Sequence, residues 1–389
     1  MLRLNSLTLE RASKSSGSIQ FQLNSETSDF SAIVMSRSIP NLLFTFLHWS
    51  GFVEGSDAKA KHRFSSRIFD ILLFLTCADV TVSTVINSEN AQKKLIAAYL
   101  SFPIVCALVW CEMRCKRKLI TSLVQNVQMV NSSFYEKVIN FAVLINYFMS
   151  LLVPTILIST VINPKFLTFF TYGYELKNSW ILCVIGILKG LLYCMLYPCV
   201  TNIVAIFYIS LCWNCSVDLN NLVKDIAKYT PEEFEQSKQL DILKKKAKIC
   251  RHLQSIQTVF SVPMFLIIVA NFLMCSCLIG GVLINIKFAE DDMIFIVYFA
   301  NAILCLITSL WVAGSVPVEM SRFKETFHQT THERLLYYHE TEELHLKMDL
   351  ITEPDFVLTG CNILPFRRST ILTVIGTLLT YTVLIVNTN

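Results

Sequence analysis

The last 34 residues of this 389-residue chain constrain its fold more than any other stretch. The basic pair Arg367-Arg368 stands directly before 18 uncharged, mostly apolar residues that end at Val386. A run of this length matches the hydrocarbon core of a bilayer, and basic residues mark the cytoplasmic side of a span. The sequence therefore predicts a terminal membrane-spanning helix whose C-terminal end lies on the opposite face from the last basic loop.

Composition extends this prediction to the whole chain. Hydrophobic residues make up 53% and charged residues 16%, with a mean hydropathy of +0.52. Soluble domains carry about 25% charged residues. The predicted fold class is an all-α membrane protein with seven transmembrane helices, at about 68–87, 94–112, 138–159, 187–212, 259–286, 293–315 and 367–387.

The distribution of basic residues predicts the orientation. Of the 33 Lys and Arg residues, 27 lie in the N-terminal segment and in the loops 113–137, 213–258 and 316–369. The positive-inside rule then places the N-terminus in the cytoplasm and the C-terminus outside the cell. The net charge of +4 is too small to indicate a nucleic-acid partner.

Two segments outside the spans have features of their own. Pro40 to Val53 is apolar but too short to cross a bilayer, which predicts an interfacial or packed helix. After the fourth span, Leu219, Leu222 and Ile226 recur at helical spacing, and Thr230-Pro-Glu-Glu233 is typical of a helix start. These helical extensions pack within the chain, form an assembly surface between subunits, or do both.

No motif in the sequence indicates an enzyme, a metal or a cofactor. The 14 cysteines lie mostly within spans, where they pack as small apolar side chains. His328 and His332 share a helix face but lack a third ligand, so a solvated amphipathic helix is the expected explanation. The chain has no Gly-x-Ser-x-Gly and no phosphate loop, so we expect no enzymatic activity.

Five polar residues within spans need partners. Lys189 near the outer end of its helix is expected to extend toward the membrane interface, and Asp79 to have a structural partner. Asn202, Asn271 and Asn301 are more often interhelical hydrogen-bond partners than ligand contacts.

Aromatic residues gather in the outer halves of several spans. They form either an interface belt or the wall of a small-molecule pocket between helices. Tyr193 and Tyr197 are four residues apart, and Tyr298 and Asn301 three apart, so each pair is predicted to share a helix face. The candidate ligand-binding residues are Tyr99, Lys189, Tyr193, Tyr197, Tyr298 and Asn301.

The last span resembles the insect gustatory receptor family. That family has Thr-Tyr, five apolar residues and Gln-Phe there, and this chain has Thr380-Tyr381, five residues and Asn387-Thr388. The stretch Phe356 to Ser369 and the run Leu219-Asn220-Asn221-Leu222 are also similar to the family. The departures at Asn387 and Thr388 point away from the sugar-receptor branch and toward a divergent member, such as a lepidopteran-type receptor for bitter plant compounds.

This resemblance implies a tastant-gated, non-selective cation channel in the plasma membrane of sensory neurons. It also implies a homotetramer, or a heterotetramer with related receptors, in which each subunit contributes its last helix to a central pore. The implied parts are a cytoplasmic segment (1–67), a six-helix ligand-binding bundle with cytoplasmic helical loops (68–315), a cytoplasmic anchor (316–366) and the pore helix (367–389).

One face of the last helix fits a pore lining. Thr380, Val383, Leu384 and Asn387 recur at spacings of three and four, which predicts an apolar constriction below a ring of amides. Without the resemblance, packing against neighbouring helices would explain the same stripe. The motif residues Tyr381 and Thr388 complete the candidate pore set.

Two other functions compete with the channel. One is a receptor of the G-protein-coupled type with inverted topology, since ordinary members of that class have the reverse orientation, and the Asp-Arg-Tyr and Asn-Pro-x-x-Tyr signatures are missing here. A secondary transporter could use Asp79 and Lys189 as coupling groups, but would show internal repeats with matching broken helices, which the sequence does not.

Overall fold

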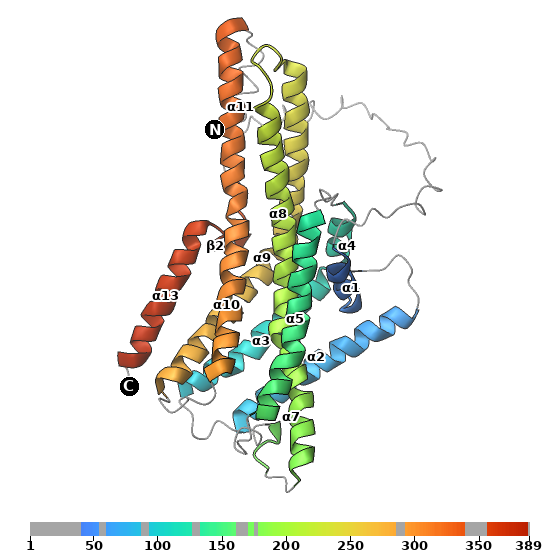
Figure 1. Cartoon of the computed structure of the whole chain (residues 1–389), viewed down its shortest axis with the longest axis vertical. Helices are drawn as coiled ribbons and strands as arrows, with labels where there is room; N and C mark the ends of the chain where they lie inside the picture. The colour runs from blue at the N-terminus through green and yellow to red at the C-terminus, as the bar shows by residue number, and fades with distance from the viewer. Residues whose placement is uncertain are drawn as a thin grey trace, which may run out of the picture. The chain divides into compact units, whose positions relative to one another are not determined.

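The computed structural model describes most of the chain and, within the described ranges, consists of helices and one short hairpin (Figure 1). Five of the helical stretches are long and apolar enough to cross a membrane. The predicted all-α membrane fold is therefore confirmed. The described residues are 40–53, 60–86, 93–126, 133–160, 170–174, 178–284, 292–338 and 356–387.

Helices cover most of each of the seven predicted spans, with 187–212 divided between α7, η1 and α8, and several helices extend beyond the spans. The elements are α1 (Asn41–Trp49), α2 (Ala60–Ile86), α3 (Lys93–Cys115), α4 (Arg117–Asn126), α5 (Ser133–Thr160), α7 (Ser179–Cys194), the π-helix η1 (Met195–Val200), α8 (Thr201–Ile226), α9 (Gln236–Ile284), α10 (Asp292–Ala313), α11 (Ser315–Tyr338), β1 (Thr359–Gly360), β2 (Leu364–Pro365) and α13 (Arg368–Asn387).

The segment before the first span forms the packed helix α1. Leu43, Phe46 and Leu47 on one face are buried, and the Phe46 ring meets Tyr147 of α5 edge to face at 5.4 Å between centroids. The sequence predicted either an interfacial helix or a packed helix here, and the structure shows a helix packed against α5.

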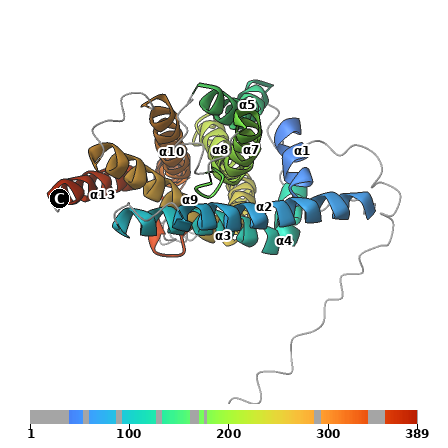
Figure 2. The same cartoon turned by 90° about the horizontal axis from the view of Figure 1, so that it is seen from below.

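The central helices are long and pack on one another. α8 lies against both α9 and α11, and α3 lies between α2 and α9 (Figures 1 and 2). Leu219, Leu222, Val223 and Ile226 on the extension of α8 are all buried, so the predicted helical extension is confirmed. It packs within the chain; whether it also meets another subunit stays a prediction.

The predicted helix start at Thr230 is wrong. Thr230 and Glu233 exchange two 3.4 Å hydrogen bonds as in a helix cap, but they close only one turn, and α9 begins at Gln236. The chain turns first because Phe234 is fully buried against Phe327 of α11, with 5.5 Å between ring centroids.

Helix α11 is more than a solvated amphipathic helix. Phe323 and Phe327 are fully buried, and α11 packs along α8. His328 and His332 do share a face as predicted, with ring centroids 6.0 Å apart.

Candidate ligand-binding site and pore helix

Pro198 breaks the helix that spans from α7 to α8. Proline has no backbone N–H, and the residue before it favours extended backbone. Tyr197 accordingly has φ −148° and ψ 130° inside η1. The prediction that Tyr193 and Tyr197 share a helix face is therefore wrong, although Pro198 in the sequence was the signal for this break.

Tyr193 lies on the α7 side of the break, in a cluster around Asp79 of α2. The Lys189 ammonium pairs with Oδ1 of Asp79 at 2.8 Å, and the Tyr193 hydroxyl donates to Oδ2 at 2.6 Å. Tyr172, from the turn before α7, also donates to Oδ1, and its ring lies 3.9 Å from the Lys189 ammonium. We name Asp79, Tyr172, Lys189 and Tyr193 the carboxylate cluster.

The carboxylate cluster decides two expectations from the sequence. The expected structural partner of Asp79 is confirmed. Lys189 does not extend to the interface, because a carboxylate within a span is costly to leave unpaired and Lys189 is the cation that reaches it. The two side chains are only 20% and 17% exposed.

Tyr197 points into a second group of residues beyond the break. Its hydroxyl donates to Oδ1 of Asn271 at 3.0 Å, and its ring meets Phe102 edge to face at 4.7 Å. The ring of Tyr298 from α10 stacks on Tyr197 at 6.3 Å, and the Tyr298 hydroxyl lies 3.1 Å from the sulfur of Cys194. The helices α3, α7, α9 and α10 and the π-helix η1 therefore meet at two stacked tyrosines.

Asn202 lies five residues after Tyr197 in the chain, and Asn301 lies three residues after Tyr298. Nδ2 of Asn202 in α8 donates to Oδ1 of Asn301 in α10 at 2.7 Å and to Oδ1 of Asn146 in α5 at 2.9 Å. Together with the Tyr197–Asn271 bond, this confirms Asn202, Asn271 and Asn301 as interhelical partners. Oδ1 of Asn202 and Nδ2 of Asn301 are nevertheless buried without a partner among the described residues.

The candidate ligand residues thus divide between two neighbouring places. Lys189 and Tyr193 belong to the carboxylate cluster, and Tyr197, Tyr298 and Asn301 lie on the other side of the break. Tyr99 is in α3, but its side chain lies outside the described residues. Sequence reasoning missed Tyr172, Cys194 and Asn146, and no local pattern marks any of them.

The pore candidates lie on α13, which packs on α9 and α10 (Figure 1). Leu378 is buried against this pair, and Tyr381 faces Phe272 of α9 at 6.5 Å between ring centroids. Thr380 and Val383 are exposed in the single chain. Leu384 and Asn387 belong to the same helix, but their side chains, and all of Thr388, lie outside the described residues. The pore stripe stays a prediction.

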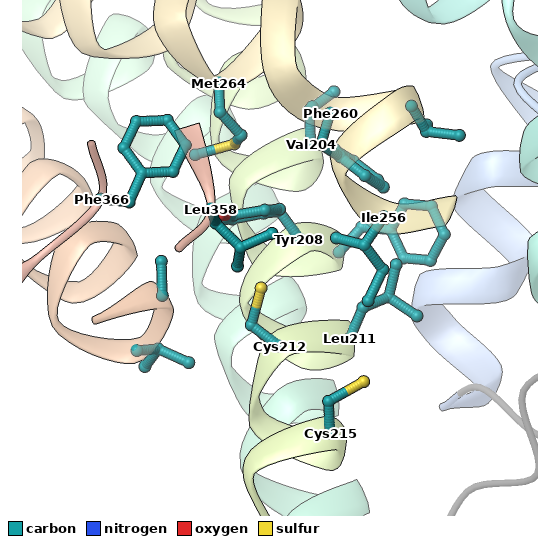
Figure 3. Packing of buried hydrophobic residues seen from close by; sticks show 14 of the residues in the cluster. Val204, Tyr208, Leu211, Cys212, Cys215, Ile256, Phe260, Met264, Leu358 and Phe366 are labelled. Atoms are coloured by element: carbon teal, nitrogen blue, oxygen red, sulfur yellow. The ribbon is translucent and has the colours of Figure 1, made fainter. Parts of the chain in front are cut away.

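A hairpin sets where α13 begins. β1 and β2 pair antiparallel, and Gln257 of α9 bonds both to the backbone N–H of Thr359 (2.9 Å) and to its carbonyl oxygen (2.8 Å). Ser261 of α9 accepts from the backbone N–H of Cys361 at 2.9 Å. Beside the hairpin, Phe366 packs against Tyr208 in the core between α8 and α9 (Figure 3). The hairpin therefore fixes the N-terminal end of α13 to α9. In the orientation predicted from the sequence, this is the end of α13 nearer the cytoplasm.

Comparisons with known proteins place the fold. No protein-family profile and no curated protein sequence matches this chain. Among solved structures it is similar to the insect olfactory receptor OR5 from Machilis hrabei, with a TM-score of 0.68 and 15% identity, covering 90% of this chain and 96% of that one. The chain has the OR5 fold. The structure of OR5 in complex with eugenol is also similar, with a TM-score of 0.63, 13% identity and the same coverage.

Proposed function

We propose that this protein is a chemosensory receptor that acts as a ligand-gated cation channel for small molecules. The observation that carries the proposal is the likeness to the olfactory receptor OR5 over 90% of the chain. The Thr380-Tyr381 motif and its surroundings favour taste over smell, and plant-derived tastants as ligands. The protein then acts as a homotetramer, or a heterotetramer with related receptors, in the plasma membrane of sensory neurons.

The proposed ligand site lies at the break between α7 and α8. OR5 binds eugenol, which supports a small-molecule site in this fold. Tyr197 and Tyr298 supply aromatic walls, while Oδ1 of Asn202 and Nδ2 of Asn301 are buried polar atoms that a ligand could satisfy. An unsatisfied buried polar atom costs about 1–3 kcal/mol, so a ligand that bonds to it gains affinity.

Expression of the chain alone in oocytes tests the channel function. Two-electrode recordings with a panel of plant compounds should show inward cation current with at least one compound and none in uninjected cells. Surface-expressed protein that stays silent with every compound, alone and with related receptors co-expressed, would contradict the proposal.

Replacing Asn301 with Ala is expected to raise the ligand concentration for half-maximal current about tenfold, because one polar anchor is worth about 1–1.5 kcal/mol. The measurement is a dose–response curve at matched surface expression. Asn178→Ala is the control. Asn178 is an exposed amide that caps the N-terminal end of α7, whereas Tyr197 follows the other end of that helix. Equal shifts in both variants would argue against a ligand contact at Asn301.

The orientation has its own test. A tag before Met1 should bind antibody only after cells are permeabilised, and a tag after Asn389 should bind it on intact cells, because 27 of the 33 basic residues lie on the predicted cytoplasmic side. The opposite pattern would favour the orientation of G-protein-coupled receptors.

Leu384→Ser is expected to produce current without ligand, because a hydroxyl weakens an apolar constriction, whereas Asn387→Ala should alter ion selectivity by removing a ring of amides. Both effects follow from helical phase. In a functional channel, cysteines placed at 380, 384 and 387 should react with a permeant thiol reagent. Reaction at 382 and 386 instead would mean that another face lines the pore.

A further inference from the structure

A cavity with a mixed apolar and polar wall lies between the extensions of α8 and α9, away from the candidate ligand residues. Its volume is about 310 Å³, which suits a small ligand. The apolar part of its wall consists of Leu211, Cys215, Leu222, Ile249 and Ile256. The polar residues in the wall are Asn214, Asp218, Asn221, Lys245, Lys248 and His252.

The cavity begins at the predicted cytoplasmic edge of the membrane. Leu211 is the last residue but one of the predicted fourth span, and Ile256 comes three residues before the fifth. With a rise of about 1.5 Å per residue, His252 and Lys248 lie about 6 Å and 12 Å further along α9 than Ile256. That interval corresponds to the headgroup layer of a bilayer, which is about 5–8 Å thick on each side, and the water beyond it.

Basic side chains outnumber acidic ones in the wall of this cavity, where Lys245 and Lys248 face Asp218, and Lys245 also pairs with Asp241 at 2.8 Å. A second cavity of about 630 Å³, between α4 and α9, shares Lys248 and His252 with it and adds Arg251. The pKa of His252 is lowered by burial and by the neighbouring Lys248 and Arg251, whose charges oppose a further positive charge. Burial raises the pKa of Asp218, the acid in the wall, against the influence of Lys248.

Asn214 supplies a donor for an anion. Its side chain is 6% exposed, it lines the cavity, and its Nδ2 has no hydrogen-bond partner among the described residues. A buried unsatisfied amide donor is unfavourable by about 1–3 kcal/mol, and a phosphate oxygen would satisfy it.

We propose that the cavity between α8 and α9 binds the headgroup of a phosphorylated inositol lipid from the cytoplasmic leaflet. Lys245, Lys248 and Asn214 bind phosphate oxygens, and Asp218 and Asn221 accept hydrogen bonds from the inositol hydroxyls. Basic sites between helices at this membrane face are suited to such headgroups. The proposal rests on the proposed orientation and does not depend on channel activity.

Binding to the full-length protein in detergent tests this directly. The probe is a fluorescent short-chain phosphatidylinositol bisphosphate, and its binding is measured as the increase in fluorescence polarisation. Lys245→Gln with Lys248→Gln should weaken binding about tenfold or more, because two charged contacts are lost. The matched control is Lys224→Gln with Lys244→Gln, which removes the same charge from exposed positions of the same two helices outside the cavity.

Competition identifies the ligand. Unlabelled phosphatidylinositol bisphosphate should displace the probe at concentrations about tenfold or more below those needed of phosphatidylserine or soluble inositol trisphosphate. Equal competition by phosphatidylserine would reduce the site to general charge attraction. Equal competition by the trisphosphate would overturn the lipid source in favour of a soluble ligand. Equal losses in the cavity and control variants, or no binding, would overturn the site itself.

Discussion

Asp79→Ala is expected to lower the free energy of unfolding by about 3–5 kcal/mol, because it leaves the largely buried Lys189 without its counter-ion. Tyr172 and Tyr193 lose their acceptor in the same step. One carboxylate bonds to α7 and to the turn before α7 from its place in α2, so its loss removes a partner that three segments share. With a total stability of about 5–15 kcal/mol, little folded protein should reach the cell surface.

A second substitution separates charge from packing. Asp79→Asn combined with Lys189→Met removes both charges, so it should recover much of the stability that Asp79→Ala loses. The measurement is the unfolding temperature of detergent-solubilised protein, monitored by size-exclusion chromatography after heating. The control is Asp225→Ala, which breaks an exposed ion pair with Lys228 and should change stability by about 0–1 kcal/mol. Equal effects at Asp79 and Asp225 would show that the buried pair is not important for stability.

The carboxylate cluster also illustrates what the sequence could not reveal. An acid in the middle of a span predicts a partner, since its ionised form is unfavourable in lipid. The partner lies 110 positions away at Lys189, and no spacing rule connects residues on different helices. Helical phase works only within a helix, and it failed between Tyr193 and Tyr197 because Pro198 interrupts the hydrogen-bond ladder.

The fold itself was largely predictable. Apolar runs of membrane length are rare by chance, and helices cover most of each predicted span, although Pro198 breaks the fourth. The extension of α8 was predictable because Leu219, Leu222 and Ile226 form a buried stripe. The start of α9 was not, because the burial of Phe234 against α11 outweighed a good cap at Thr230. Local signals therefore set the helices, and contacts between helices set their ends and their polar partners.

Gly314→Ala is expected to displace the start of the last helix. Gly314 joins α10 to α11, and a Cβ there would lie 2.7 Å from the backbone nitrogen of Arg368, 2.9 Å from the carbonyl oxygen of Leu310 in α10 and 3.1 Å from the carbonyl carbon of Arg367. These are main-chain atoms, which cannot rotate away as a side chain can. Contacts under 3.0 Å are essentially never seen for a real Cβ, so the backbone must move.

Neither side of this contact can move freely. Thr370 at the start of α13 bonds to the carbonyl oxygen of Pro365 at 2.7 Å, and the Arg368 guanidinium lies 4.5 Å from the ring centroid of Trp311 in α10. Excess volume in a packed site costs about 1–3 kcal/mol. We therefore expect a lower unfolding temperature and, because the displaced helix carries the proposed pore stripe, altered ligand-evoked current at equal surface expression.

Gly376→Ala is the matched control, because a Cβ at Gly376 in α13 meets nothing within 4 Å. Alanine is favoured over glycine within a helix by about 0.5–1 kcal/mol, so this variant should keep or raise the unfolding temperature of the single subunit. A loss at Gly376 as large as at Gly314 would mean that any added methyl near α13 is harmful. A loss confined to Gly314 would mean that the close approach of two backbones sets the position of the last helix.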